Sequence, residues 1–370
     1  MVLIKRFLTA MLTLLIFLMG TIVSFGLNTS AKSAVLIEAE SGQVIFENNA
    51  YQRLPMASTT KIMTAIVAIE NCDLHRNITI TEEMVGAEGS SIYLKVGEKL
   101  TLEQLLYALM LESANDAAEA IAVSIGGSLE RFSEMMNDRV AKLGLKDTSF
   151  VNPHGLDADG HYTTASDLAA ITAYALKNEV FAKIVSTNEY VIIENEYSPR
   201  RYLNNHNKLL RIFDGTIGVK TGYTKACGRC LVSAAERNGV RLIAVTLSAP
   251  DDWNDHMNML NYGFDQLENV LLASPGTIKI ELPVLCGESN VVTVTNKSKL
   301  SVVLKKDHSD IKVSICSKFG KYLFAPIDID EYVADAIFYA DGKEIAKIPL
   351  YTDFDVTGLS SKSLFDHFDF

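Results

Sequence analysis

At 370 residues, with 48% hydrophobic and 21% charged residues, the chain is long enough for two globular domains with sizeable cores. Its formal net charge is -11 at pH 7, so the sequence offers no broad basic surface and argues against nucleic acid as a partner. The same acidic balance would not draw the protein to anionic lipid by charge alone.

Residues 1–31 have the pattern of an export signal. Lys5 and Arg6 precede an apolar run over residues 7–27, and residues 29–31 are small, as at a cleavage site. We therefore expect a signal peptide over residues 1–31. An uncleaved anchor helix is the alternative, because the run is nearly long enough to span a bilayer. Either outcome predicts an extracytoplasmic protein, in the cell envelope or secreted.

The first folded elements should be two strands and a buried helix. Residues 34–47 form two strand patterns around a Ser41-Gly42 turn. Pro55 and Ser58 then mark the start of a helix whose run over residues 62–69 is apolar nearly all round. Such a helix is typical of the centre of a domain, where a lysine would be partly removed from water.

The middle of the chain, about residues 101–185, is predicted to be mostly helical. It follows a loop-rich stretch over residues 76–100 that contains several glycines. Thr101 and Gln104 form a capping-box pattern at the start of the first helix. The expected helices cover residues 102–111, 117–125, 129–143 and 165–177.

Strands return after this helical stretch. We expect them at residues 188–193, 216–221, 231–236 and 240–248, the last two joined by an Asn238-Gly239 turn. A helix over residues 254–272 should follow. Early strands, a helical middle and late strands predict an α+β domain over residues 32–273. Its antiparallel sheet is built from both ends of the domain and is flanked by helices, with a helical insert.

Residues 273–276, Ala-Ser-Pro-Gly, predict a linker to a second domain. Short strand patterns follow at residues 278–285, 291–295, 300–304, 311–315, 336–339 and 344–348. Neither a serine–lysine pair nor a histidine cluster stands out in that sequence. We therefore expect a small all-β domain over residues 277–365, with a supporting role.

The five cysteines are scattered and odd in number, which does not indicate a disulfide framework. They are Cys72, Cys227, Cys230, Cys286 and Cys316. Cys227 and Cys230 form a lone Cys-x-x-Cys motif. Without a second such pair or a suitably spaced histidine, a zinc site is not expected. The sequence leaves open whether these two residues form a local disulfide or stay free thiols.

Three short motifs carry the chemistry. Ser58 and Lys61 lie on one face of a helix, and burial would lower the pKa of the lysine until it can take a proton from the serine. Ser113-Ala114-Asn115 lies in the break between two helices, and Lys220-Thr221-Gly222 lies at the end of a strand. Each motif alone could be a helix cap or a strand end. Their joint occurrence in this order predicts one catalytic site.

On these motifs the chain resembles the serine-type D-alanyl-D-alanine carboxypeptidases, the low-molecular-mass penicillin-binding proteins. The matching stretches lie at residues 54–65, 105–111, 115–118, 152–156, 161–163 and 220–224. One departure is Glu112-Ser113-Ala114-Asn115, where many members have Pro-Ser-Gly-Asn, although the serine and asparagine are kept. The resemblance implies a β-lactamase/transpeptidase-like first domain and a reaction that needs neither a cofactor nor a metal.

The family implies a role for each residue of the motifs. Ser58 would attack the carbonyl between two D-alanines, Lys61 would accept the serine proton, and water would later hydrolyse the acyl-enzyme. The other implied roles are a proton relay for Ser113, a bond to the substrate amide for Asn115, carboxylate binding for Lys220 and Thr221, free space at Gly222, and an oxyanion hole from the backbone N–H groups of Ser58 and Tyr223.

The implied function is a carboxypeptidase that removes the terminal D-alanine of peptidoglycan pentapeptide stems and that penicillin and other β-lactams inhibit. A β-lactamase shares the motifs, but no Glu-x-x-Leu-Asn occurs in residues 150–190, where the deacylating glutamate of the class A type is expected. A DD-endopeptidase that cuts cross-links is a further alternative. So is a penicillin-binding or peptidoglycan-binding sensor without turnover.

Two further features are given supporting roles. His154, His161 and His206 could suggest a serine–histidine triad, but no Gly-x-Ser-x-Gly surrounds Ser58, so we expect them to be structural or to support other residues. The C-terminal residues 363–370 alternate apolar and acidic side chains without Lys or Arg. They give only weak support for contact with a membrane surface.

Overall fold

The computed structural model describes residues 27–359, which divide into two compact units. The N-terminal unit comprises the chain up to Ala235 with Ile243–Tyr262, and the C-terminal unit comprises Glu236–Leu242 with the chain from Gly263 onward. Residues 1–26 of the expected signal peptide and all of the C-terminal residues 363–370 lie outside the described residues. Among residues 27–359, no helix is both long and apolar enough to span a bilayer.

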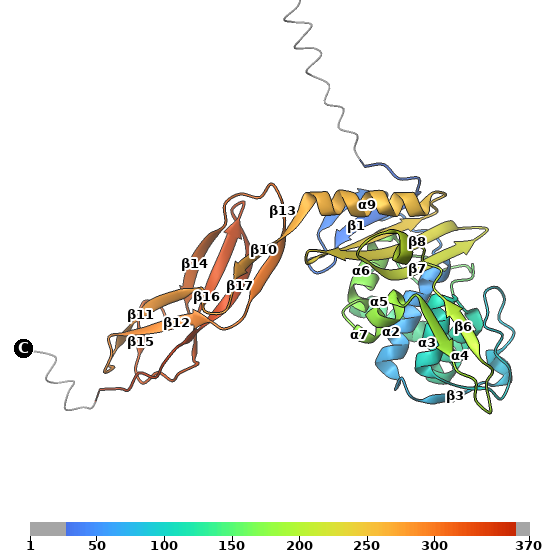
Figure 1. The fold of residues 1–370 in the computed structure, drawn as a ribbon, viewed down its shortest axis with the longest axis horizontal. Coiled ribbons are helices and arrows are strands. Elements are labelled where there is room, and N and C mark those ends of the chain that lie inside the picture. The colour runs from blue at the N-terminus through green and yellow to red at the C-terminus, as the bar shows by residue number, and fades with distance from the viewer. Residues whose placement is uncertain (1–26, 360–370) are drawn as a thin grey trace, which may run out of the picture. The chain divides into compact units, whose positions relative to one another are not determined.

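The N-terminal unit is built on a five-stranded sheet with the strand order β2-β1-β9-β8-β7 (Figure 1). β1 (Ser33–Glu38) and β2 (Val44–Asn48) come from the start of the domain, whereas β7 (Thr216–Thr224), β8 (Gly228–Arg237) and β9 (Val240–Leu247) come from its end. The predicted sheet built from both ends of the domain is confirmed. β7 is last in this order, so within residues 27–359 its outer edge is not paired with another strand of the sheet.

Tight turns fix the register of these late strands. Asn238 and Gly239 join β8 to β9 with positive φ angles of 51° and 75°, the conformation that an Asn-Gly hairpin turn requires. β7 and β8 pair antiparallel and place Gly222 opposite Cys230 and Tyr223 opposite Arg229. The strand predicted to end at Thr221 therefore continues through Gly222 to Thr224.

The helical insert lies between β2 and β7 in the chain. Its helices are η1 (Ala57–Thr60), α2 (Lys61–Asn71), η2 (Glu82–Met84), α3 (Leu102–Leu111), α4 (Asn115–Gly126), α5 (Leu129–Lys142), α6 (Ala165–Ala175), α7 (Glu179–Ser186) and α8 (Leu209–Ile212). Thr101 and Gln104 make both bonds of the predicted capping box. Short strand pairs, β3 (Asn77–Thr79) with β4 (Lys99–Thr101) and β5 (Glu189–Ile192) with β6 (Arg201–Asn204), complete the insert.

Helix α2 forms the centre of the N-terminal unit, as its all-round apolar sequence predicts. Every residue from Lys61 to Ala68 is buried. α2 contacts α3, α4, α5, α6 and α7, so its surface is covered by other helices. Lys61 at its first position is therefore surrounded by protein on a rigid element.

The C-terminal unit is all-β, as expected. Its six-stranded sheet has the order β14-β16-β17-β12-β11-β15, and β10 pairs with β13 in a separate ribbon. The strands are β10 (Leu267–Ala273), β11 (Lys279–Leu285), β12 (Val291–Asn296), β13 (Leu300–Lys305), β14 (Lys312–Ser317), β15 (Leu323–Phe324), β16 (Tyr332–Ala340) and β17 (Lys343–Thr352). The boundaries of 32–273 and 277–365 for the two domains stay predictions.

One predicted element is wrong in its last part. The helix expected over residues 254–272 is α9 (Asp252–Gln266), and the residues after it form strand β10. Leu267, Val270 and Leu271 have helical spacing, but β10 pairs antiparallel with β13 along its whole length. Because β13 is distant in the sequence, the local spacing of apolar residues could not predict that these residues form a strand.

Candidate active site

Ser58 and Lys61 lie at the junction of η1 and α2, and the side chain of Lys61 is fully buried. Its Nζ contacts three oxygens: Ser58 Oγ at 3.0 Å, Asn115 Oδ1 at 2.6 Å and the carbonyl oxygen of His154 at 2.6 Å. Burial, and secondly the charge of Lys220, lower the pKa of Lys61 well below its ordinary value. Lys61 therefore faces the site rather than bulk water, and its amine is set up to exchange a proton with Ser58.

The turn before Ser58 is held by a close backbone contact. Ala57 has a positive φ of 47°. Gly155, with φ +93°, lies so near that a Cβ there would be 1.9 Å from the carbonyl oxygen of Ala57. A side chain at position 155 would displace the turn, so the loop that carries the His154 carbonyl depends on glycine to reach Lys61.

Ser113 lies in the break between α3 and α4, as predicted, and Asn115, which was expected there too, begins α4. Ser113 has a positive φ of 60°. Asn115 donates its backbone N–H to the carbonyl oxygen of Ser90 at 2.7 Å and its side-chain amide to that of Glu88 at 2.5 Å. These bonds turn Oδ1 of Asn115 toward Lys61. They also fix the loop that carries Ser90.

Strand β7, which contacts η1, carries the predicted substrate-binding residues Lys220, Thr221, Gly222 and Tyr223. Lys220 is 1% exposed, and burial lowers its pKa to about 7. Its Nζ donates to the carbonyl oxygen of Thr221 at 3.0 Å. A Cβ on Gly222 would lie 3.1 Å from the backbone nitrogen of Ser58, so the glycine allows strand and nucleophile to approach closely.

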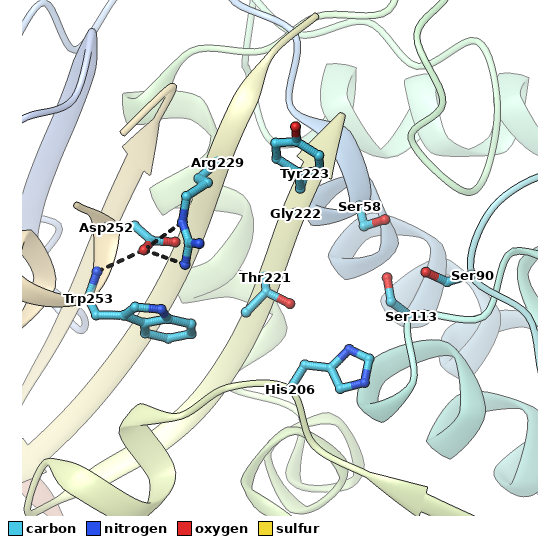
Figure 2. Close-up of a pocket in the computed structure, with 10 residues that line it drawn as sticks. All are labelled: Ser58, Ser90, Ser113, His206, Thr221, Gly222, Tyr223, Arg229, Asp252 and Trp253. Atoms are coloured by element: carbon cyan, nitrogen blue, oxygen red, sulfur yellow. Dashed lines mark hydrogen bonds and ion pairs between the residues drawn. The ribbon is translucent and has the colours of Figure 1, made fainter. Parts of the chain in front are cut away.

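A cavity of about 620 Å³ opens over these residues. Figure 2 shows the hydroxyl groups of Ser58, Ser90 and Ser113 on one side, β7 in the middle, and Arg229, Asp252 and Trp253 beyond that strand. Five predicted residues line the cavity: Ser58, Ser113, Thr221, Gly222 and Tyr223. The other three, Lys61, Asn115 and Lys220, are buried behind its wall. The three motifs thus meet at one place.

Five residues that line the cavity were not predicted as site residues: Ser90, His206, Arg229, Asp252 and Trp253. Arg229 has a weak sequence signal, since the hairpin register places it opposite Tyr223. Its guanidinium forms an ion pair with Asp252 at 2.8 Å. Asp252 and Trp253 begin α9, and the sequence held no sign that the start of that helix would border the site.

The three histidines differ in position. Burial lowers the pKa of His154 to about 3 and that of His161 to about 4, so both are neutral at pH 7. His161 contacts Thr60 at 2.8 Å, next to the nucleophile motif, and His154 supplies a backbone oxygen to Lys61. His206 lines the cavity, 3.3 Å from Glu112. Supporting roles fit His154 and His161, whereas His206 could meet a ligand directly.

Comparison with known proteins gives matches along nearly the whole chain. The family model described as D-alanyl-D-alanine carboxypeptidase matches residues 21–251, and the one described as Penicillin-binding protein 5, C-terminal domain, matches residues 267–357. D-alanyl-D-alanine carboxypeptidase DacF of Bacillus subtilis is 35% identical over 330 residues, which cover 86% of this chain and 84% of the relative. DacA of Escherichia coli is 32% identical over 341 residues, covering 86% and 82%.

Solved structures resemble the chain in the same way. Penicillin binding protein 5 from Haemophilus influenzae has a TM-score of 0.70 and 28% identity, covering 89% of this chain and 98% of that one. A mutant of the Streptomyces K15 DD-transpeptidase has a TM-score of 0.61 and 34% identity, covering 64% and 98%. The second of these similarities spans a smaller part of the chain than the first.

Proposed function

Because the chain belongs to the D-alanyl-D-alanine carboxypeptidase family, we propose that Ser58 is the nucleophile through which it works. Family membership makes the protein a serine-type D-alanyl-D-alanine carboxypeptidase, a hydrolase. The observation that carries the choice of Ser58 is its 3.0 Å contact with Nζ of the buried Lys61.

Lys61 acts as the general base. A neutral amine has two hydrogens and one lone pair, and the oxygens of Asn115 and His154 accept the two hydrogens. The lone pair is then left facing the Ser58 hydroxyl. Burial supports this neutral state, because it lowers the pKa of Lys61. Ser58 Oγ loses its proton to Nζ as it attacks the carbonyl carbon of the penultimate D-alanine.

The backbone N–H groups of Ser58 and Tyr223 stabilise the oxyanion that forms. The close approach of Gly222 to the Ser58 nitrogen supports their placement around one substrate oxygen. Ser113, whose hydroxyl borders the cavity beside Ser58, relays the proton to the leaving amine. Water then hydrolyses the ester and frees Ser58.

Lys220 and Thr221 bind the terminal carboxylate of the substrate. Thr221 offers its hydroxyl to the cavity, and the charged form of Lys220 favours an anion near it. Asn115 binds the substrate amide by exchanging its side-chain bond to the Glu88 carbonyl oxygen for one to the peptide. Gly222 leaves room for the peptide to lie along the outer edge of β7. A peptide that ends in a free carboxylate fits this arrangement.

The family acts on peptidoglycan stem peptides and binds β-lactams. For this chain we propose the pentapeptide stem as substrate and β-lactams as inhibitors that acylate Ser58. We further propose that the enzyme works outside the cytoplasm, because residues 1–31 have the composition of an export signal.

The test compares the wild-type protein with Ser58→Ala on a diacyl-Lys-D-Ala-D-Ala peptide. Wild-type protein should release D-alanine, and the variant should not, while both unfold at the same temperature. A fluorescent penicillin should label the wild type alone, and peptide mapping should find the label on Ser58. Equal release of D-alanine by both proteins would refute the proposal.

The persistence of the acyl-enzyme separates the alternatives. A long-lived penicillin adduct with release of D-alanine from the peptide fits a carboxypeptidase, whereas steady penicillin hydrolysis would favour a β-lactamase. A stable adduct without peptide turnover would favour a sensor. Cleavage of cross-linked stem peptides would identify an endopeptidase.

A further inference from the structure

We propose that Cys227 and Cys230 are a site of reversible disulfide formation that controls the acylation of Ser58. The modification stands on the geometry of the two thiols, and the control rests on the proposed role of Ser58. Their sulfur atoms are 3.9 Å apart, and both side chains are buried, with 3% and 0% exposure. A disulfide bond of about 2.05 Å needs only a modest further approach. The residues between them are Gly228, with a positive φ of 71°, and Arg229.

Cys227 is the thiol better suited to start the reaction. Its Sγ accepts a hydrogen bond from Thr224 Oγ1 at 3.2 Å and lies within bonding distance of the Cys230 thiol. The bond from Cys230, and then that from Thr224, lower the pKa of Cys227 to about 6. Cys227 also lies in the turn between β7 and β8, whose other residues, Lys225 and Ala226, are exposed. An opening of this turn would present the thiolate to solvent.

The oxidant is a small-molecule or protein disulfide. The Cys227 thiolate attacks one sulfur of that disulfide and expels the other as a thiolate. Cys230 then loses its proton to water and attacks Cys227 Sγ, which releases the second thiolate. Two S–H bonds become one S–S bond, and the two electrons leave on the oxidant as two thiols. An extracytoplasmic location would favour this reaction.

The pair lies directly behind the proposed site. Cys230 is opposite Gly222 in the β7–β8 register, and Gly222 is the residue against which Ser58 packs. Cys230 Sγ also lies 4.0 Å from the carbonyl oxygen of Pro55, just before the nucleophile turn. A shift of the Cys230 sulfur toward Cys227 would therefore disturb two contacts of the Ser58 turn. One is with the Pro55 carbonyl oxygen, and the other is with Gly222 on β7.

Thr224 gives the pair a second connection to the site. Its single hydroxyl proton has two acceptors, Cys227 Sγ at 3.2 Å and Asp157 Oδ1 at 3.1 Å. A thiolate is a good acceptor and a disulfide sulfur is a poor one, so oxidation leaves this proton to Asp157. Asp157 follows the loop that holds Gly155 and the His154 carbonyl against Ala57 and Lys61. Oxidation thereby draws the loop toward β7, and we expect it to slow acylation.

The test uses the full chain with Cys72, Cys286 and Cys316 replaced by Ser, so that only the pair remains, and a matched protein that also carries Cys227→Ser. Both are incubated with glutathione disulfide and then with a fluorescent penicillin. In the first protein, the peptide that contains both cysteines should lose two hydrogens. Its acylation should slow by about threefold to tenfold, and dithiothreitol should restore the rate. The Cys227→Ser protein should show equal rates with and without the oxidant.

Two results would overturn the proposal. One is a pair that stays reduced or stops at a glutathione adduct. The other is an internal disulfide that leaves the acylation rate unchanged. Mass spectrometry detects the disulfide whether or not penicillin reacts with the protein. A reduced protein that is not labelled by penicillin would therefore count against Ser58 as nucleophile, and it would not be confused with a failure of the thiol chemistry.

Discussion

The two units of this chain bury different kinds of side chain. The interior of the N-terminal unit contains Lys61, Lys220 and Asp116, each no more than 2% exposed. In the described part of the C-terminal unit, the buried polar side chains are Asn296 and Thr352, both neutral and bonded to backbone oxygens. Its core is otherwise apolar. Burying an ionisable group costs free energy whether it stays charged or is neutralised. Among the described residues such groups lie deep in the N-terminal unit alone, which indicates that this unit gives up some stability for catalysis.

Backbone conformation follows the same division. Ala57 and Ser113 have positive φ angles directly at the site, on residues that carry a side chain. Each is held by its surroundings: Gly155 packs on Ala57, and Ser113 lies between two buried helices. In the C-terminal unit, Cys286, Asp330 and Asp341 also have positive φ, but all three are exposed and lie in turns or bends away from any packed helix. Asp tolerates that conformation more readily than most residues.

The largest expected effect comes from removing the buried amine of Lys61. Lys61→Met should lower the acylation rate of Ser58 by about 10²–10⁴-fold, the usual contribution of a general base. The same change should leave the melting temperature equal or higher, because a buried amine is replaced by an apolar group of similar length. Stopped-flow labelling with penicillin and calorimetry measure the two quantities.

A surface control sharpens this test. Lys177→Met, at an exposed position after α6, should change neither acylation nor stability. A Lys61→Met protein that acylates at the wild-type rate would remove Lys61 from the mechanism. One that acylates slowly and also melts far below the wild type would show that Lys61 stabilises the fold, against the comparison made above.

The second prediction places one substitution in both units. Gly155 and Gly342 both have positive φ, but a Cβ at Gly155 would meet the Ala57 carbonyl at 1.9 Å, whereas one at Gly342 would meet nothing within 4 Å. Gly342→Ala should therefore cost about 1 kcal/mol for the backbone conformation alone. Gly155→Ala should cost about 3 kcal/mol or more, because the turn before Ser58 must move.

Denaturant titration can follow the N-terminal unit alone, because Trp253 is the single tryptophan of the chain and lies in that unit. Calorimetry covers the C-terminal unit. Gly155→Ala should also slow acylation, whereas Gly342→Ala should not. Equal costs for the two variants would mean that the contact at Ala57 is easily relieved.

The third prediction concerns Lys220. Its charge is the second cause, after burial, of the lowered pKa of Lys61. Lys220→Met removes that charge, so the pKa of Lys61 should rise, and the acid limb of the acylation rate should move to higher pH. The quantity to compare is the pH at the midpoint of the acid limb. The maximum rate is not suitable, because Lys220→Met should also lower it by weakening carboxylate binding. An acid limb at the same pH as in the wild type would mean that the charge of Lys220 does not lower the pKa of Lys61.

The stability of the N-terminal unit should also depend on the ionisation of Lys220. The pKa of Lys220 is about 7 in the folded protein against an ordinary value of 10.5, so between these values the unfolded chain binds more protons than the folded one. The N-terminal unit should therefore gain stability as pH rises through that window and lose it as pH falls. In Lys220→Met this part of the slope should disappear. A slope that persists unchanged would assign it to other groups.

The sequence predicted the parts of the fold and of the candidate site that are local or carried by a motif. Ser58 with Lys61 follows from helical spacing, and the Asn238-Gly239 turn follows from its own conformational preference. The residues that were missed reach the site through distant packing. Trp253 and Asp252 border the cavity only because α9 begins beside β8, and no pattern in residues 251–255 reports that neighbour.

The same reason explains the error at β10. Its residues have a helical spacing, and only the pairing with β13 decides for a strand. Burial was predicted well where the sequence is apolar on all sides, as in α2. Lys220 is different: a lysine in a strand gives no local sign of being 1% exposed, and its depth became visible only with the helices packed against β7.

The smallest expected effects lie at the surface, where the two units should be alike. Glu70 pairs with Arg139 in the N-terminal unit, with both side chains about one-fifth exposed, and Asp330 pairs with Lys297 in the C-terminal unit, where both are more open. Glu70→Gln should cost about 0.5–1 kcal/mol and Asp330→Asn about 0.5 kcal/mol or less, since solvent screens such pairs. Added salt should reduce both values, as calorimetry at two ionic strengths can measure. A cost above that of Gly155→Ala at either position would contradict the view that the units differ in what they bury, because the difference would then lie in their surfaces.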